Sequence, residues 1–170
     1  EEVEKIWTMK DDKYYQIPLM LLYNGTRISE FLSLKKENVH LDEQYFDVID
    51  SKTENGIRKV PIADKLLPFY KAWYESCPDC KYLLHTEDGK PFKYRNYFDS
   101  YWTPLMEQIG ITRTPHCTRH TCISMLSEAG IQETTIKKIV SHSGAMTLTE
   151  KVYTHLDVQV LVDAINKILE

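Results

Sequence analysis

The sequence predicts an α+β fold that is mostly α-helical and contains one small three-stranded antiparallel sheet. Two observations lead to this fold class. Apolar residues recur at the spacing of amphipathic helices over most of the chain. One internal stretch, residues 39–62, is instead rich in β-branched and aromatic residues and is divided by turn-forming residues. The chain has 170 residues, of which 42% are hydrophobic and 27% charged, so we expect a single globular domain.

The first half of the chain is expected to hold two helices followed by the sheet. Residues 13–23 carry an apolar face, interrupted by Pro18, and this helix should end at the following Asn24-Gly25 pair. A second, short helix should begin near Ile28. The strands are expected at 39–41, 45–49 and 57–62, with turns at 42–43 and 54–56.

The second half is expected to be helical with one looped section. Asp88-Gly89 and Pro91 predict this loop, which follows a helix that begins near residue 64. Helices are expected at 64–75, 95–109, 118–129, 133–140, 149–155 and 158–169. The last of these is amphipathic, so residues 157–170 are expected to form a C-terminal tail helix.

Composition excludes several classes of protein. The longest apolar run, residues 17–23, has seven residues, whereas a membrane-spanning helix needs about 20. The chain opens with acidic residues, without an initiator Met or an apolar signal core, so we interpret it as a cytoplasmic fragment of a longer protein. Its four cysteines are too few for a disulfide scaffold, and we expect free thiols, as in a cytosolic protein. Cys77 and Cys80 have CxxC spacing, which we interpret as plain loop cysteines, with a metal or redox role as the alternative.

Charge is distributed unevenly along the chain. The net charge of −4 argues mildly against nucleic acid as a partner. Residues 52–71 and 90–122, however, each hold five basic and two acidic side chains. If these two segments share a face, that face attracts an anion such as DNA.

Residues 114–121 form the first pattern that points to chemistry. Pro115 disfavours a helical conformation at the residue before it, so a helix should begin near His116. His116 and Arg119 then lie on one face of the first turn, where backbone N–H groups favour an anion. The pair is a candidate phosphate site, although this spacing is also common on ordinary surface helices.

Arg27 belongs to a similar pattern. It follows a glycine break at the start of a helix, where its guanidinium could clamp the oxygens of one phosphodiester together with Arg119. Glu30 is three residues further along and could orient Arg27. Taken alone, the segment fits an ordinary surface salt bridge better than a phosphate clamp.

Three further residues are candidates by position. Lys52 is expected at the tip of a hairpin, from which a lysine can reach into a cleft as a proton donor. His142 is expected at a helix end, and Tyr153 in the short helix that follows. Singly, each fits a solvated turn or ordinary core packing.

Together and in this order, these residues resemble the catalytic domain of tyrosine recombinases, the phage and conjugative-transposon integrase family. The matching stretches are Gly-Thr-Arg-Ile-Ser-Glu, Ser-Lys-Thr with Arg-Lys-Val-Pro, His-Cys-Thr-Arg-His-Thr, and Val-Ser-His-Ser-Gly with Val-Tyr-Thr-His. The resemblance covers residues 14–156. The six active-site positions of the family fall on Arg27, Lys52, His116, Arg119, His142 and Tyr153.

The resemblance implies a site-specific recombinase that breaks and rejoins DNA strands without a metal or other cofactor. Tyr153 would be the nucleophile and would form a 3′-phosphotyrosine intermediate. The implied partners are double-stranded DNA and further recombinase protomers, with no membrane, and the implied role is integration or excision of a mobile element. The upstream core-binding and arm-binding domains of the family would be missing from residues 1–170.

Two other functions stay open at this point. His116 and His120 have the i, i+4 spacing of a metal-ligand pair, as in a metal-dependent nuclease, but Arg119 between them would repel a cation. A non-catalytic DNA-binding module could retain the same fold. Loss of activity in a chelator would favour the nuclease, and the absence of a covalent protein–DNA adduct would favour the module.

Two segments are candidate contact regions. Lys93, Tyr94 and Arg95 lie at the start of the helix expected at 95–109, and we expect them to contact DNA near the cut. A solvated loop is the alternative for these three residues. The tail helix at 157–170 either docks on a neighbouring protomer, as in similar recombinases, or closes its own core.

Overall fold

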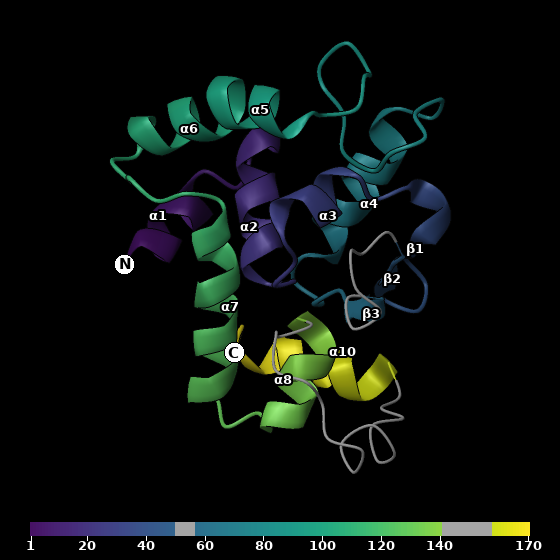
Figure 1. Cartoon of the computed structure of the whole chain (residues 1–170), viewed down its shortest axis with the longest axis vertical. Helices are drawn as coiled ribbons and strands as arrows, with labels where there is room; N and C mark the ends of the chain where they lie inside the picture. Colours follow the sequence, from purple (N-terminus) through teal and green to yellow (C-terminus); the bar gives the residue numbers. More distant parts are fainter. Residues whose placement is uncertain (50–56, 141–157) are drawn as a thin grey trace.

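The computed structural model describes residues 1–49, 57–140 and 158–170. These residues form a mostly helical domain with one three-stranded sheet, which confirms the predicted fold class (Figure 1). The helices are α1 (Glu2–Thr8), α2 (Gln16–Leu22), α3 (Ile28–Leu32), α4 (Leu67–Ser76), α5 (Tyr94–Tyr97), α6 (Thr103–Gln108), α7 (His116–Glu128), α8 (Glu133–Val140) and α10 (Val158–Lys167). The strands are β1 (Val39–His40), β2 (Tyr45–Val48) and β3 (Arg58–Pro61). No helix in the described parts of the chain is long and apolar enough to cross a membrane.

The sheet is an antiparallel meander in the order β1-β2-β3. Phe46 in β2 pairs with Val39 in β1 and with Val60 in β3, and all three side chains are buried. Alternate residues of a strand point to opposite faces, so Arg58 shares the inward face of β3 with Val60. An arginine thus projects from the sheet toward the protein interior.

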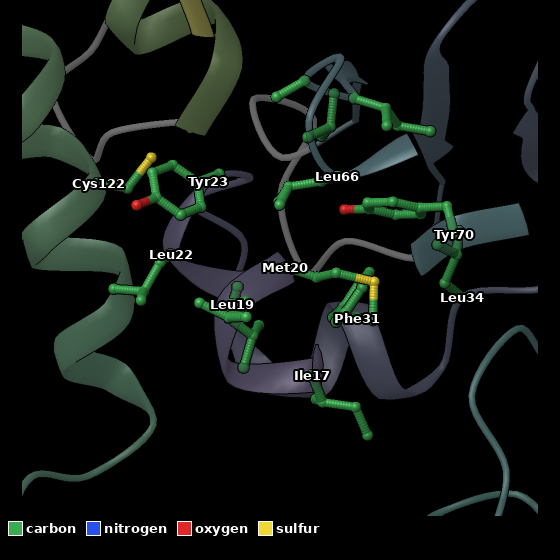
Figure 2. Packing of buried hydrophobic residues seen from close by; sticks show 14 of the residues in the cluster. Ile17, Leu19, Met20, Leu22, Tyr23, Phe31, Leu34, Leu66, Tyr70 and Cys122 are labelled. Atoms are coloured by element: carbon green, nitrogen blue, oxygen red, sulfur yellow. The ribbon is translucent and has the colours of Figure 1, made fainter. Parts of the chain in front are cut away.

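Helix α2 lies at the centre of the core. All six of its residues from 17 to 22 are buried, so this helix is covered on every side rather than along one stripe. Figure 2 shows Phe31 and Tyr70 on one side of it and Cys122 of α7 on the other. Pro18 is the third residue of α2, where backbone N–H groups have no partner within the helix, so it costs the helix little.

Helix α1 is not among the predicted elements. Ile6 is buried, and Trp7 Nε1 donates a 2.9 Å hydrogen bond to the Tyr23 hydroxyl at the end of α2. A helix of seven residues is too short to be stable alone. Contacts with the core, which local periodicity does not reveal, therefore stabilise it.

The helix predicted at 95–109 forms as α5, a π-helical turn at Phe98–Trp102 and α6. Pro104, the second residue of α6, lacks the N–H that would bond the carbonyl of Ser100. A wider π turn just before the proline accommodates this lost bond. The predicted helix is therefore present with a bulge that the apolar spacing does not indicate.

Helix α10 packs against its own chain, beside β3 and α8 (Figure 1). Leu161 and Ile165 are buried. Asn166 Oδ1 accepts a 2.8 Å hydrogen bond from the backbone N–H of Asp64, just after the sheet. In this structure the tail helix therefore packs on the core of its own chain, and its docking on a neighbouring protomer stays a prediction.

Cys77 and Cys80 form a disulfide in the loop after α4, so the prediction of free thiols is wrong for this pair. The chain turns at this point, with the Cys80 N–H donating to the Cys77 carbonyl at 3.0 Å. The turn leaves the two Cα atoms 5.3 Å apart, within the span of a disulfide. Cys117 and Cys122 are free thiols as predicted.

Candidate active site

The turn between α2 and α3 carries the first candidate arginine. Asn24 is fully buried, and its Oδ1 accepts 2.9 Å hydrogen bonds from both the backbone N–H and the hydroxyl of Thr26. Its Nδ2 donates to the Tyr70 hydroxyl at 3.2 Å. These bonds fix the path of the chain from the buried α2 to Arg27.

Gly25 is required in this turn for two reasons. Its φ is 67°, a left-handed conformation that favours glycine. A Cβ here would lie 2.5 Å from Val140 Cγ1 and 3.3 Å from Cys122 Sγ. The turn therefore lies directly against α7 and the last residue of α8, so three segments that are distant in the sequence meet at this point.

Arg119 on α7 reaches the same turn. The residue is 5% exposed, and its Nη1 donates a 2.8 Å hydrogen bond to the Gly25 carbonyl oxygen. Burial, together with the charges of Arg27 and Arg58, lowers the pKa of Arg119 to about 10. Arg119 therefore remains cationic at neutral pH, in surroundings that favour a bound anion.

Arg27 is the N-cap residue of α3. Its backbone N–H donates a 2.9 Å hydrogen bond to Glu30 Oε1, while its Nη1 lies 3.6 Å from Glu30 Oε2. The Arg27 side chain is 42% exposed and the Glu30 side chain only 7%. Glu30 thus contacts Arg27, as their spacing suggests, and the Arg27 guanidinium stays accessible from solution.

Arg58 belongs to the same cluster and is not identified from the sequence. Its Nη2 and Nη1 donate to Glu30 Oε1 and Oε2 at 3.1 and 3.2 Å, and its Nε donates to the Ile139 carbonyl at 2.7 Å. Burial alone would raise the pKa of Glu30, but the hydrogen bonds and charge of Arg58, with those of Arg27, lower this pKa below its ordinary value. The two-residue spacing between Arg58 and the buried Val60 is the signal that would have found it.

His116 is the first residue of α7, as predicted, and its side chain is exposed. Its ring meets that of His120 edge to face, with 4.7 Å between ring centroids. Partial desolvation lowers the pKa of His116, and so do the charges of His120, Arg119 and Arg27. A neutral imidazole can accept a proton or a hydrogen bond at pH 7.

Of the six predicted active-site residues, Arg27, His116 and Arg119 come together where α3 and α7 begin. Lys52, His142 and Tyr153 lie outside the described residues. Within residues 1–49, 57–140 and 158–170, no three His, Cys, Asp or Glu side chains form a group that could hold a metal ion.

The expected DNA-contact residues Lys93, Tyr94 and Arg95 are all exposed at the start of α5. Arg95 Nε lies 3.8 Å from an Asp99 carboxylate oxygen one turn further along. Helix α5 packs against α3, the helix that Arg27 caps. The segment is thus connected to Arg27 by the packing of α5 on α3. Its contact with DNA stays a prediction.

Comparison with known proteins places the chain among recombinases. It matches the phage integrase family over residues 1–159. Tyrosine recombinase XerA of Thermococcus onnurineus is 31% identical over 98% of this chain and 60% of its own length. A tyrosine recombinase of Pseudothermotoga lettingae is 26% identical over 99% of this chain and 59% of its own. The chain therefore spans about three-fifths of the length of these curated relatives.

Solved structures share the fold. An XerA recombinase has a TM-score of 0.72 and 23% identity over 95% of this chain and 59% of its own. The integrase of mycobacterium phage Brujita has a TM-score of 0.75 and 20% identity over 98% and 55%. The Tn1549 transposon integrase, solved in complex with circular intermediate DNA, has a TM-score of 0.72 and 21% identity over 91% and 60%. Since the family match extends over nearly the whole chain, this protein belongs to the phage integrase family of tyrosine recombinases.

Proposed function

We propose that this chain is the catalytic domain of a site-specific recombinase that cleaves and rejoins DNA during integration or excision of a mobile element. The observation that carries the proposal is the meeting of two arginines at one turn. Arg119 donates to the Gly25 carbonyl, and Arg27 follows Gly25 by two residues. His116 lies one helical turn before Arg119. This group combines positive charge with a proton acceptor, as in-line displacement at a phosphate requires.

The proposed reaction begins with attack of the Tyr153 Oη on a DNA phosphorus. The bond from this oxygen to phosphorus forms as the bond from phosphorus to the 5′ oxygen breaks, leaving a 3′-phosphotyrosine and a 5′-hydroxyl. Ionising a phenol with a pKa of about 10 costs about 4 kcal/mol at pH 7, which nearby cations and a base offset. A 5′-hydroxyl from the partner strand then attacks the phosphotyrosine, rejoins the DNA and releases Tyr153 without ATP.

The other residues act on this displacement. Arg27 and Arg119 hold the non-bridging phosphate oxygens and stabilise the charge of the transition state. His116, whose pKa is lowered, accepts the phenol proton or a hydrogen bond from the phenol. Lys52 protonates the departing 5′ oxygen, and His142 donates a hydrogen bond to a non-bridging oxygen.

Double-stranded DNA and further recombinase protomers are the proposed partners, assembled as a tetrameric synapse in the cytoplasm. The DNA-bound Tn1549 integrase, which has the same fold, supports DNA as a partner. So do the 42% exposure of the Arg27 side chain and the exposed residues at the start of α5, because phosphate oxygens need accessible cationic donors.

A nicked suicide substrate tests the proposal. A duplex with the attachment sequence of the mobile element is nicked close to the cut, so that the short end diffuses away and religation stops. We expect a protein–DNA adduct that survives denaturing electrophoresis and forms equally well in excess chelator. DNA binding without an adduct would contradict the proposal in favour of a non-catalytic module. Strand cleavage that requires added Mg²⁺ would contradict it in favour of a metal-dependent nuclease.

A further inference from the structure

We propose that Arg58 is a positioning residue. By occupying both oxygens of the Glu30 carboxylate, it keeps the Arg27 guanidinium available for the phosphate. The inference rests on the proposed function, because it concerns the availability of one of the two phosphate-binding arginines.

The side chains of Arg58 and Arg27 both lie near the Glu30 carboxylate, but they contact it differently. Arg58 donates to both oxygens, at 3.1 and 3.2 Å, and Oε1 also accepts the Arg27 backbone N–H at 2.9 Å. The Arg27 guanidinium is 3.6 Å from Oε2, which is an ion-pair contact but beyond hydrogen-bond distance. Glu30 therefore accepts hydrogen bonds from the side chain of Arg58 but only from the backbone of Arg27.

Burial strengthens the preference for Arg58. Its side chain is 3% exposed and that of Glu30 is 7%, whereas the Arg27 side chain is 42% exposed. Charges in contact attract more strongly where water does not screen them. The carboxylate is thus held by the buried partner, while the exposed arginine keeps donors for a ligand from solution.

Loss of Arg58 would leave a buried carboxylate without its bidentate partner. Arg27 is already within 4 Å of Glu30 and could form a two-bond pair with it by a small shift. Donors committed to the carboxylate cannot hold phosphate oxygens. The expected defect is therefore in the rate of cleavage, through Arg27, and not only in folding.

A second contact makes the arrangement rigid. Arg58 Nε donates to the carbonyl of the buried Ile139 on α8, in the same guanidinium plane whose two Nη atoms bind Glu30. The planar fork thereby connects β3, α3 and α8. The single nitrogen of a lysine could not make this set of bonds.

The test uses the full-length protein and compares three variants. These are Arg58→Met, the double variant Glu30→Gln/Arg58→Met, and Arg113→Met as the control. The control removes an arginine that pairs with Glu2 on the surface, where the side chains are 62% and 47% exposed. For each variant, the rate of adduct formation on the suicide substrate and the affinity for DNA are measured at a temperature at which circular dichroism shows it folded.

Arg58→Met should slow adduct formation by about 10²-fold, the typical cost of losing one preorganised donor to the transition state, with little change in DNA affinity. The double variant should recover most of this loss. The amide oxygen that Glu30→Gln introduces would still accept the Arg27 N–H, but the amide carries no charge to attract the Arg27 guanidinium. Replacing a whole buried ion pair is also far less disruptive than breaking it. Arg113→Met should match the unaltered protein.

The outcomes separate the two proposals. An unaltered protein that forms no adduct would overturn the proposed function itself. An adduct rate for folded Arg58→Met equal to that of the unaltered protein would overturn only the positioning role, as would a folded double variant that is no faster than Arg58→Met. If Arg58→Met does not fold, the adduct rate of the double variant tests the positioning role. A rate near that of the unaltered protein supports the role, and a rate about 10²-fold below that of the unaltered protein contradicts it.

Discussion

A single buried arginine on α7 connects the fold to the proposed chemistry. Arg119 donates to the Gly25 carbonyl, and the nearby Glu30 carboxylate opposes part of the lowering of its pKa. A guanidinium has five donors in one plane, so it can bond the turn and still present donors to a phosphate. The hydrogen bond to Gly25 thus fixes Arg119 at the turn that leads into Arg27.

Arg119→Lys is expected to lower the rate of adduct formation by about 10²–10³-fold while DNA affinity changes little. Lysine retains the charge but loses the planar fork that would bond the turn and the phosphate together. Single-turnover adduct formation measures the rate, with Arg113→Lys, at an exposed position, as the matched control. A near-normal rate in Arg119→Lys would place the phosphate clamp elsewhere.

The sequence predicts helix starts correctly where a single glycine or proline determines the backbone conformation. Gly25 and Pro115 mark the helix starts beside Arg27 and His116, and the structure has α3 and α7 beginning there. Arg58 was missed because its role comes from a strand register and a distant carbonyl. Most arginines in proteins are exposed to solvent, so the sequence around Arg58 does not indicate that this residue is buried. Only the tertiary structure reveals its buried partners.

At the level of elements, the prediction was most accurate for a helix with a clear apolar face. The helix of residues 133–140 has the same bounds in the structure, and the predicted strands are present but shorter. Helix α1 was missed because it depends on packing against α2. The π turn before Pro104 was missed because apolar spacing does not report a lost backbone hydrogen bond.

The packing of α10 predicts a difference between two of its residues. Ile165→Ala should lower the free energy of unfolding by about 2–5 kcal/mol, because Ile165 is fully buried against the core. Val160→Ala on the same helix should cost much less, since Val160 is 44% exposed. Urea denaturation of both variants measures the difference. Equal stabilities would show that α10 does not close the core of its own chain in solution.

The start of α5 predicts a salt-dependent effect on DNA binding. Replacing both Lys93 and Arg95 by Ala should weaken binding and reduce the slope of log affinity against log salt by up to about 2, since each phosphate contact releases counterions. Exposed Lys71 and Lys81, replaced by Ala in the same way, provide a control with the same change in charge. Slopes that fall equally in both double variants would place the start of α5 away from DNA.

For the whole molecule, net charge is a poor guide to the partner. The chain carries −4 overall. Among the described residues, however, Arg27 and Arg58 contact the Glu30 carboxylate, and Arg119 bonds the turn just before Arg27, where α3, α7, α8 and β3 meet. This local excess of positive charge, and not the sum over the chain, is what a phosphodiester would encounter. The fold concentrates it by bringing together segments that are separated by up to about a hundred residues in the sequence.

The proposed mechanism requires that Tyr153 becomes covalently attached to DNA, and identifying the attached residue is its sharpest test. The adduct formed on the suicide substrate is trimmed with nuclease and protease, and the modified peptide is sequenced by mass spectrometry. The chain has 11 tyrosines, so the assignment is specific. We predict a nucleotide on Tyr153 and no adduct in Tyr153→Phe, which retains DNA binding because the substitution removes only the nucleophilic hydroxyl. A nucleotide on any other residue, or an adduct in Tyr153→Phe, would contradict the account.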